Sequence, residues 1–319
     1  MIELWNTNAA QTPTGLAYSR FLQLSEIVHK MLAEQNVTAS AQSRLAQYDH
    51  VIAKLVRAKF GAAPLDNASA PVLARAVSEL WQLAIISCYA RSRAANPLFQ
   101  EKARLLIKDA AIPEPTGTKP SPGRDTQFEL FVVACWSLAG IQCELREPPG
   151  PDFKLTLGGV EVGLEAKRVK SIDSLPRRFA KAEDQLSNME NGGIIVTDLS
   201  GVVAQGQSYL VPGSPDASPI EDLEGRLKRL MASRIGKIGR KRRTFAWVGY
   251  CESLYLFKHE AVSFVYQWKN FNFVRGDDSR WLALVEVFGQ LVTSGTRMLE
   301  DLSVITSPVK QVPPVRENR

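Results

Sequence analysis

The sequence predicts an α/β protein whose first third is helical, and three observations lead to this prediction. Between about residues 15 and 109, apolar residues recur at three- and four-residue spacing, which is typical of amphipathic helices. Residues 112–122 are rich in Pro, Gly, Ser and Thr, which indicates a linker. Residues 125–200 then alternate in the order helix, three strands, helix and strand. We therefore expect the following division of the chain: a helical N-terminal domain at 1–115, a linker at 116–123, an α/β domain at 124–306 and a flexible tail at 307–319.

The composition is that of a globular protein with a modest excess of positive charge. Of the 319 residues 45% are hydrophobic and 23% are charged, and the formal net charge is +6. This excess permits a polyanionic partner without requiring one. The N-terminus lacks the pattern of a signal peptide, and the longest apolar run, around residues 130–141, is too short to span a bilayer. The four cysteines match no zinc-binding spacing, so we expect free thiols in a cytoplasmic protein.

The α/β part is predicted to open with an apolar helix. Asp125 can cap its start and Gly140 can end it. Glu129 is the one acid between these limits that lies inside an otherwise apolar run. A lone acid on a helix is usually solvated, but few positions of this helix are free to face water.

A β-hairpin is expected next, because polar and apolar residues alternate on both sides of a Gly-Gly pair. The alternation covers residues 152–157 and 160–167, and Gly158-Gly159 suits a tight turn. Glu165 and Lys167 should lie side by side on one face of the return strand. The hairpin should bring Asp152 close to Glu165, and Gly163 should leave open space beside them.

A second helix and a buried strand are expected after the hairpin. The helix should run from about residue 175 to residue 191, with Gln185 beside its apolar stripe, and Gly192-Gly193 should end it. Residues 193–200 form an apolar run that is typical of a buried strand.

The converging side chains suit the hydrolysis of a phosphodiester. One or two Mg²⁺ ions bound by hard oxygen ligands can position a water, neutralise phosphoryl oxygens and help the leaving oxygen. Asp152 and Glu165 are such ligands, the backbone carbonyl of Ala166 is a third, and Glu129 could complete the site or position a water. Lys167 would orient the attacking water or stabilise developing negative charge. We expect Mg²⁺ as cofactor, with Mn²⁺ as a substitute.

Pro151-Asp152 followed across a hairpin by Glu165-Ala166-Lys167 resembles the PD-(D/E)xK, or restriction-endonuclease-like, nuclease superfamily. Glu129 looks like the acid that many members carry on the first core helix, and Gln185 is similar to a glutamine found in some branches. The resemblance covers residues 124–200. It implies a three-layer αβββαβ core with a mixed central sheet and a catalytic set that includes Glu129 and Gln185. The implied activity is a magnesium-dependent nuclease, an endonuclease acting on DNA in preference to RNA.

The C-terminal third begins with a predicted loop at 201–219 and carries a basic run from Arg226 to Arg243 that no acid interrupts. One interpretation of this run is a ridge that contacts nucleic-acid phosphates; the other is a solvated helix face and loop. The residues assigned to the ridge are Arg234, Lys237, Arg240, Lys241, Arg242 and Arg243. Strands at 244–257 and 261–268 are rich in aromatic residues, for which packing is preferred to base stacking, and an apolar helix is expected at 278–299.

Three alternatives stay open at this point. The hairpin could be an ordinary surface hairpin with Glu165 and Lys167 as solvated neighbours. The chain could be a non-catalytic nucleic-acid-binding or protein-interaction module on a nuclease-like fold. The helical N-terminal domain could carry the function by forming a homodimer or binding a protein partner.

Overall fold

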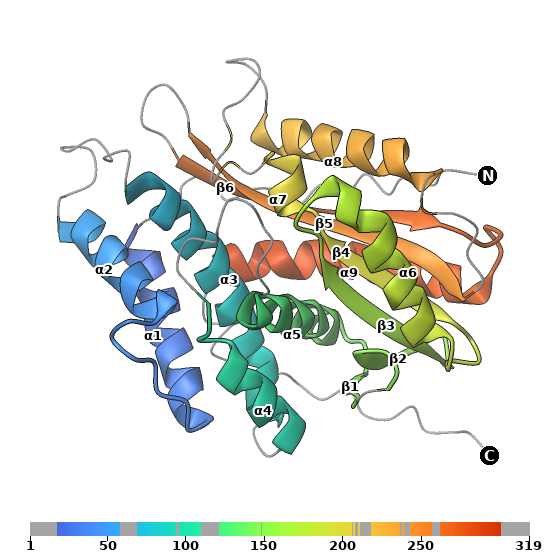
Figure 1. Cartoon of the computed structure of the whole chain (residues 1–319), viewed down its shortest axis with the longest axis horizontal. Helices are drawn as coiled ribbons and strands as arrows, with labels where there is room; N and C mark the ends of the chain where they lie inside the picture. Colours follow the sequence, from blue (N-terminus) through green and yellow to red (C-terminus); the bar gives the residue numbers. More distant parts are fainter. Residues whose placement is uncertain are drawn as a thin grey trace.

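The computed structural model shows N-terminal helices followed by a six-stranded mixed sheet with helices interspersed among its strands (Figure 1). It describes residues 18–57, 69–93, 96–109, 121–147, 149–205, 207, 210, 218–236, 238, 243–256 and 262–300. The predicted α/β class is therefore confirmed.

The elements have the following bounds. The helices are α1 (Tyr18–Glu34), α2 (Arg44–Arg57), α3 (Ser69–Arg93), α4 (Pro97–Leu105), α5 (Pro122–Leu138), α6 (Leu175–Leu186), α7 (Ser200–Val203), α8 (Pro219–Ile235) and α9 (Ser279–Glu300), with a short 3₁₀ turn η1 (Ile172–Ser174). The strands are β1 (Cys143–Leu145), β2 (Phe153–Leu157), β3 (Val160–Arg168), β4 (Gly193–Asp198), β5 (Thr244–Leu256) and β6 (Val262–Asn272).

The strands lie in the sheet in the same order as in the chain. β1, β2 and β3 are antiparallel neighbours, β3, β4 and β5 are parallel, and β6 pairs antiparallel with β5. Parallel neighbours need a crossover, and helices supply it: α6 joins β3 to β4, and α7 and α8 lie between β4 and β5. The sequence from α5 to β4 therefore reads helix, three strands, helix and strand, as predicted.

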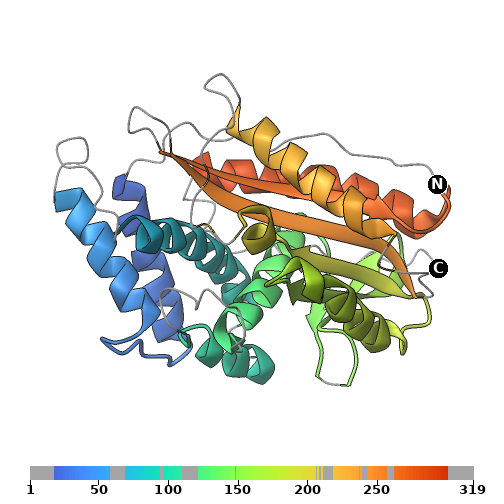
Figure 2. The same ribbon diagram turned by 45° about the horizontal axis from the view of Figure 1, so that its top comes forward.

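Helices cover both faces of the sheet. α3, α5 and α9 pack on one face, and α6 and α8 pack on the other (Figure 2). Two clusters of buried apolar side chains correspond to the two faces. The larger one runs without a break from α1, α2 and α3 through α5 into the sheet, so the N-terminal helices share a hydrophobic core with it.

Several boundaries differ from those that the sequence predicts. α5 begins at Pro122, so Asp125 lies in the first turn of the helix and does not cap it. The first strand, expected at residues 141–147, covers only Cys143–Leu145. α6 ends at Leu186, before the predicted end at residue 191. A short helix, α7, occupies the start of the segment that was expected to be a loop. The predicted tail at 307–319 and most of the predicted linker lie outside the described residues.

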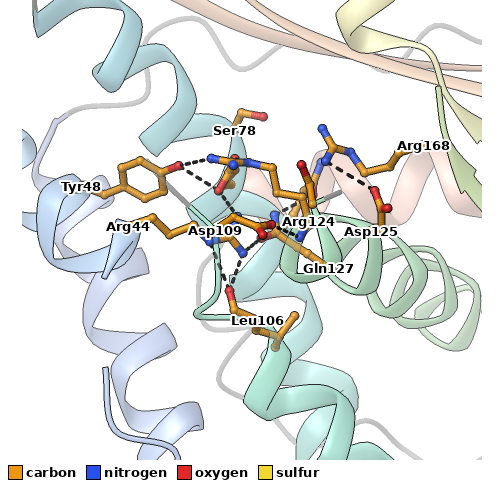
Figure 3. A network of polar contacts seen from close by, with 12 residues as sticks. Arg44, Tyr48, Ser78, Leu106, Asp109, Arg124, Asp125, Gln127 and Arg168 are labelled. Atoms are coloured by element: carbon orange, nitrogen blue, oxygen red, sulfur yellow. Dashed lines mark hydrogen bonds and ion pairs between the residues drawn. The ribbon is translucent and has the colours of Figure 1, made fainter. Parts of the chain in front are cut away.

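The N-terminal helices and α5 are joined by buried charges as well as by apolar packing (Figure 3). Glu79 on α3 accepts hydrogen bonds from Arg44 on α2 and from Arg124 Nε on α5, the latter at 2.6 Å. Tyr48 Oη donates to Glu79 at 2.9 Å, and Arg44 also donates to Gln127 Oε1 at 2.8 Å. Burial alone would raise the pKa of Glu79, but the two guanidinium groups outweigh it and lower the pKa to about 2. Glu79 is therefore ionised and holds three helices together.

A second buried acid, Glu252 on β5, links α3 to the sheet through neutral donors. Gln82 Nε2 donates to Glu252 Oε1 at 2.7 Å, and the hydroxyls of Ser78 and Tyr250 also donate to this carboxylate. Burial, together with the charge of Asp198, raises the pKa of Glu252 to about 7, because the hydrogen bonds compensate only in part.

This raised pKa predicts a dependence of stability on pH. Glu252 binds its proton more tightly in the folded than in the unfolded protein, so its contribution to stability is complete below about pH 4.5. It is lost as the pH rises through about 7. The loss approaches about 1.4 kcal/mol per pH unit for one proton. The free energy of unfolding, measured in urea, should fall less for Glu252→Gln than for the wild type when the pH is raised from 5 to 8. Equal losses would contradict the prediction.

Three smaller expectations can be compared with the structure. All four cysteines are buried free thiols. Trp247, Tyr250, Tyr255 and Trp268 are buried, so packing is their role. No helix within the described ranges is long and apolar enough to cross a membrane.

Candidate active site

The candidate site forms where β3 extends beyond its partner strand β2. β3 has nine residues and β2 has five, and Phe153, the first residue of β2, pairs with Leu164. The Gly158-Gly159 turn has positive φ at both residues, which suits a tight hairpin and sets this register. The residues of β3 after Leu164 therefore project past the start of β2, and Asp152 lies opposite this projecting end.

Asp152 is fixed there by its backbone and by its side chain. Its N–H donates to Glu165 Oε1 at 2.9 Å, and its carbonyl accepts from Arg146 N at 3.1 Å. Its Oδ2 accepts a hydrogen bond from Ala166 N at 3.1 Å. The carboxylate therefore takes the place of the backbone carbonyl that a longer β2 would offer to this N–H. Because the N–H and C=O of one strand residue point to the same side, the Ala166 carbonyl faces this edge too.

Lys167 binds both carboxylates of the site. Its Nζ lies 3.3 Å from Asp152 Oδ2, and it forms an ion pair with Glu165 Oε2. Glu165 is fully buried, and the side chains of Asp152 and Lys167 are 13% and 10% exposed. The predicted convergence of Asp152, Glu165 and Lys167 is therefore present, and the surface-hairpin alternative does not describe these residues.

The buried charges perturb one another. Burial, and then the charge of Asp152, raises the pKa of Glu165 to about 8, although Lys167 opposes the shift. Burial would lower the pKa of Lys167, but Asp152 and Glu165 outweigh it, and the pKa lies above its ordinary value. Lys167 thus stays charged near neutral pH, while Glu165 holds its proton more tightly than an ordinary carboxyl group does.

Glu129 lies beside this group, and none of its described hydrogen bonds joins it to the three residues. Its Oε2 pairs with Lys102 Nζ at 2.6 Å, and Lys102 comes from the N-terminal helix α4. Burial, and then the charge of Asp152, raises the pKa of Glu129, while Lys102 and Lys167 oppose the shift. Glu129 therefore belongs to the electrostatic environment of Asp152 and Lys167, and its direct partner is a lysine that the sequence did not suggest.

Gln185 on α6 contacts the turn that leads into Asp152. Its Nε2 donates to the carbonyl of Gly150 at 3.3 Å, and its Oε1 is buried with no hydrogen-bond partner among the described residues. None of the described contacts joins Gln185 to the carboxylates. It therefore supports the site through the backbone before Asp152.

Gly163 does not leave open space, which contradicts the prediction from its missing side chain. A Cβ atom at this position would come within 2.6 Å of Leu186 and 2.9 Å of Met189. The side chains at the end of α6 and just after it fill the space, so the glycine permits close packing of this segment against β3.

Only two of the basic residues assigned to a nucleic-acid ridge fall within the described part of the chain. Arg234 lies in the last turn of α8, which packs over β5 and β6. Arg243 directly precedes β5; its N–H donates to Glu183 Oε1 at 2.6 Å and its Nη1 donates to the carbonyl of Glu190 at 3.3 Å. The other four, Lys237, Arg240, Lys241 and Arg242, lie outside the described residues.

The site offers oxygen ligands for a cation, although not as a closed cluster. Within the described ranges, no group of three or more His, Cys, Asp or Glu side chains is arranged to hold a metal ion. Asp152, Glu165 and the Ala166 carbonyl nevertheless share one edge, where burial and then the charge of Asp152 raise the pKa of Glu165. Carboxylate and carbonyl oxygens are the ligands that Mg²⁺ prefers, and Mg²⁺ usually keeps several waters. The donor chemistry therefore fits a divalent cation.

Lys102 is the residue of this site that sequence reasoning missed. It precedes Glu129 by 27 positions, and no motif spacing connects the two. Comparison with protein-family models, curated proteins and solved structures finds no match to this chain. The geometry of the site and the fold therefore carry the functional argument.

Proposed function

We propose that this protein is a metal-dependent nuclease that hydrolyses phosphodiester bonds of nucleic acid, with DNA favoured over RNA. The observation that carries the proposal is that Asp152, Glu165 and Lys167 contact one another at the projecting end of β3. Two buried carboxylates beside a charged lysine are costly to fold, because each buried charge loses its hydration. Such an arrangement suits a site that binds a cation and a negatively charged substrate.

The fold supports the same proposal. The order α5, β1, β2, β3, α6, β4 and the mixed sheet between two helical layers agree with a restriction-endonuclease-like core. In that interpretation Asp152 directly precedes the second strand and Glu165 lies in the third. Glu129 lies on the first core helix and Gln185 on the second. The N-terminal helices are an addition to this core.

Asp152, Glu165 and the Ala166 carbonyl would hold the Mg²⁺ ion, or Mn²⁺ in its place. The bound cation would supply charge neutralisation at the phosphoryl oxygens and lower the pKa of a coordinated water. Asp152 is suited to its part because hydrogen bonds fix its backbone on both sides of the side chain. Gln185 would keep the turn before Asp152 in place through Gly150.

Lys167 would stabilise negative charge and orient the attacking water. Its pKa is raised, so its ammonium group keeps its proton and does not act as the general base. A fixed positive charge in a buried site stabilises developing negative charge more strongly than it would in water. The basic residues from Arg234 to Arg243 would contact phosphates away from the scissile bond.

Incubation of the purified full chain with labelled DNA and RNA, single- and double-stranded, tests this function. We expect cleavage in Mg²⁺ or Mn²⁺ and none in EDTA, with DNA cut faster than RNA. Circular substrates should be cut as well as linear ones if the enzyme is an endonuclease. Salt-sensitive binding without cleavage under any of these conditions would replace the proposal with a non-catalytic nucleic-acid-binding module.

A further inference from the structure

Lys102 and Glu129 form an ion pair between two parts of the chain that the sequence assigns to different domains. The Nζ–Oε2 distance is 2.6 Å, and the two side chains are 18% and 17% exposed. An ion pair on an open surface contributes little, but here both charges are more than four-fifths removed from water. The pair therefore differs from an ordinary surface contact.

The position of Lys102 is set by the docking of α4. The side chain of Asn96 caps the helix by accepting from Leu98 N and Phe99 N. Phe99 and Ala103 are fully buried, and α4 packs against α5. Because Ala103 directly follows Lys102, the lysine is held at the edge of this contact and faces Glu129.

Glu129 lies on α5, which packs against β3, the strand that carries Glu165 and Lys167. Among its electrostatic neighbours are Asp152, which repels it, and Lys167, which attracts it. Without Lys102, the like charge of Asp152 would favour a rotation of Glu129 away from the site. Lys102 is thus placed to hold Glu129 beside Asp152.

We propose that Lys102 is a positioning residue of the catalytic centre, so that the N-terminal helices complete the site; this inference rests on the nuclease function proposed above. Lys102 acts through Glu129 and does not touch the reacting atoms. The loss of such an outer partner typically costs about 10- to 100-fold in activity or metal affinity.

The test is a double-mutant cycle in the full chain with Lys102→Met, Glu129→Gln and the double variant. We expect Lys102→Met to lower kcat about 10- to 100-fold with little change in KM. Lys102→Arg should recover most of the rate. In the Glu129→Gln background, Lys102→Met should have no further effect, because the residue through which it acts is already lost. Arg104→Met, at an exposed position of the same helix, is the matched control and should leave kcat unchanged.

Mn²⁺ titration by calorimetry gives a second readout that does not depend on cleavage. Lys102→Met should weaken Mn²⁺ binding about tenfold. Tighter binding would mean that Lys102 only repels the cation, and it would overturn the inference. Thermal unfolding of each variant gives the fraction of folded protein. If Lys102→Met lowers stability but leaves kcat per folded molecule unchanged, the role of Lys102 is purely structural and the inference is overturned.

The two failures are distinguishable. If the wild type cuts nucleic acid and Lys102→Met cuts it equally fast, the inference is wrong and the nuclease function stands. If the effects of Lys102→Met and Glu129→Gln multiply, Lys102 does not act through Glu129 and the inference is again wrong. If the wild type neither cuts nucleic acid nor binds Mn²⁺, both proposals fall.

Discussion

Glu165→Gln and Lys167→Met should each lower the rate of nucleic-acid cleavage about 100- to 1,000-fold, with the folded structure retained. Glu165→Gln removes a negative charge that would hold the cation, and it keeps the shape of the side chain. Lys167→Met removes the charge that binds both carboxylates and would stabilise the phosphoryl oxygens. Cleavage rates under single-turnover conditions, with circular dichroism as the check on folding, measure the effect.

The same hairpin offers a matched control. Lys154 and Glu161 form an ion pair at 2.5 Å, and the side chain of Glu161 is 59% exposed. Lys154→Met and Glu161→Gln therefore repeat the two substitutions on the same pair of strands, away from the candidate site. We expect their cleavage rates to match the wild type. Equal rates in all four variants would show that the carboxylate and lysine at the end of β3 take no part in catalysis.

Glu79→Ala should lower the free energy of unfolding by about 3–5 kcal/mol. The substitution leaves the guanidinium groups of Arg44 and Arg124 buried without their shared carboxylate, since their side chains are 0% and 3% exposed. Removal of one member of a buried ionic group is more harmful than replacement of the whole group, because the remaining charges stay desolvated. Urea unfolding followed by tryptophan fluorescence measures the change.

Glu144→Ala provides the comparison on the surface. Glu144 is 63% exposed and lies 3.8 Å from Arg146, so its loss should cost less than about 1 kcal/mol. A similar small effect for Glu79→Ala would contradict the role that we assign to the buried network between α2, α3 and α5.

The hairpin and the acid–lysine group could be predicted because they depend on local rules. A period of two places Glu165 and Lys167 on one face of β3, and the Gly-Gly turn sets the register that brings Asp152 beside them. The interpretation of α5 as a helix with little free surface is also confirmed, since most of its residues are buried.

The contacts of Glu129 and Gly163 could not be predicted, because they depend on tertiary packing. Lys102 reaches Glu129 only through the docking of α4 on α5, and no periodicity in the sequence reports how two helices lie against each other. The space beside Gly163 is filled by side chains that follow it by more than twenty residues. A missing side chain in the sequence says nothing about which neighbour takes its place.

The buried charges are a second kind of information that sequence patterns lack. Glu79 and Arg44 are among the residue types that are rarely buried without a partner, so an assignment by polarity places them on the surface. Their partners come from three helices, and only the assembled fold brings them together.

A crystal of the full chain soaked in Mn²⁺ tests the claim that Asp152, Glu165 and Lys167 form a cation-dependent catalytic centre. Diffraction recorded near the manganese absorption edge locates the ion by its anomalous signal. We predict a peak in direct contact with the carboxylates of Asp152 and Glu165, and no peak at this position in crystals of Glu165→Gln. Manganese bound only elsewhere in the wild-type protein would contradict the claim.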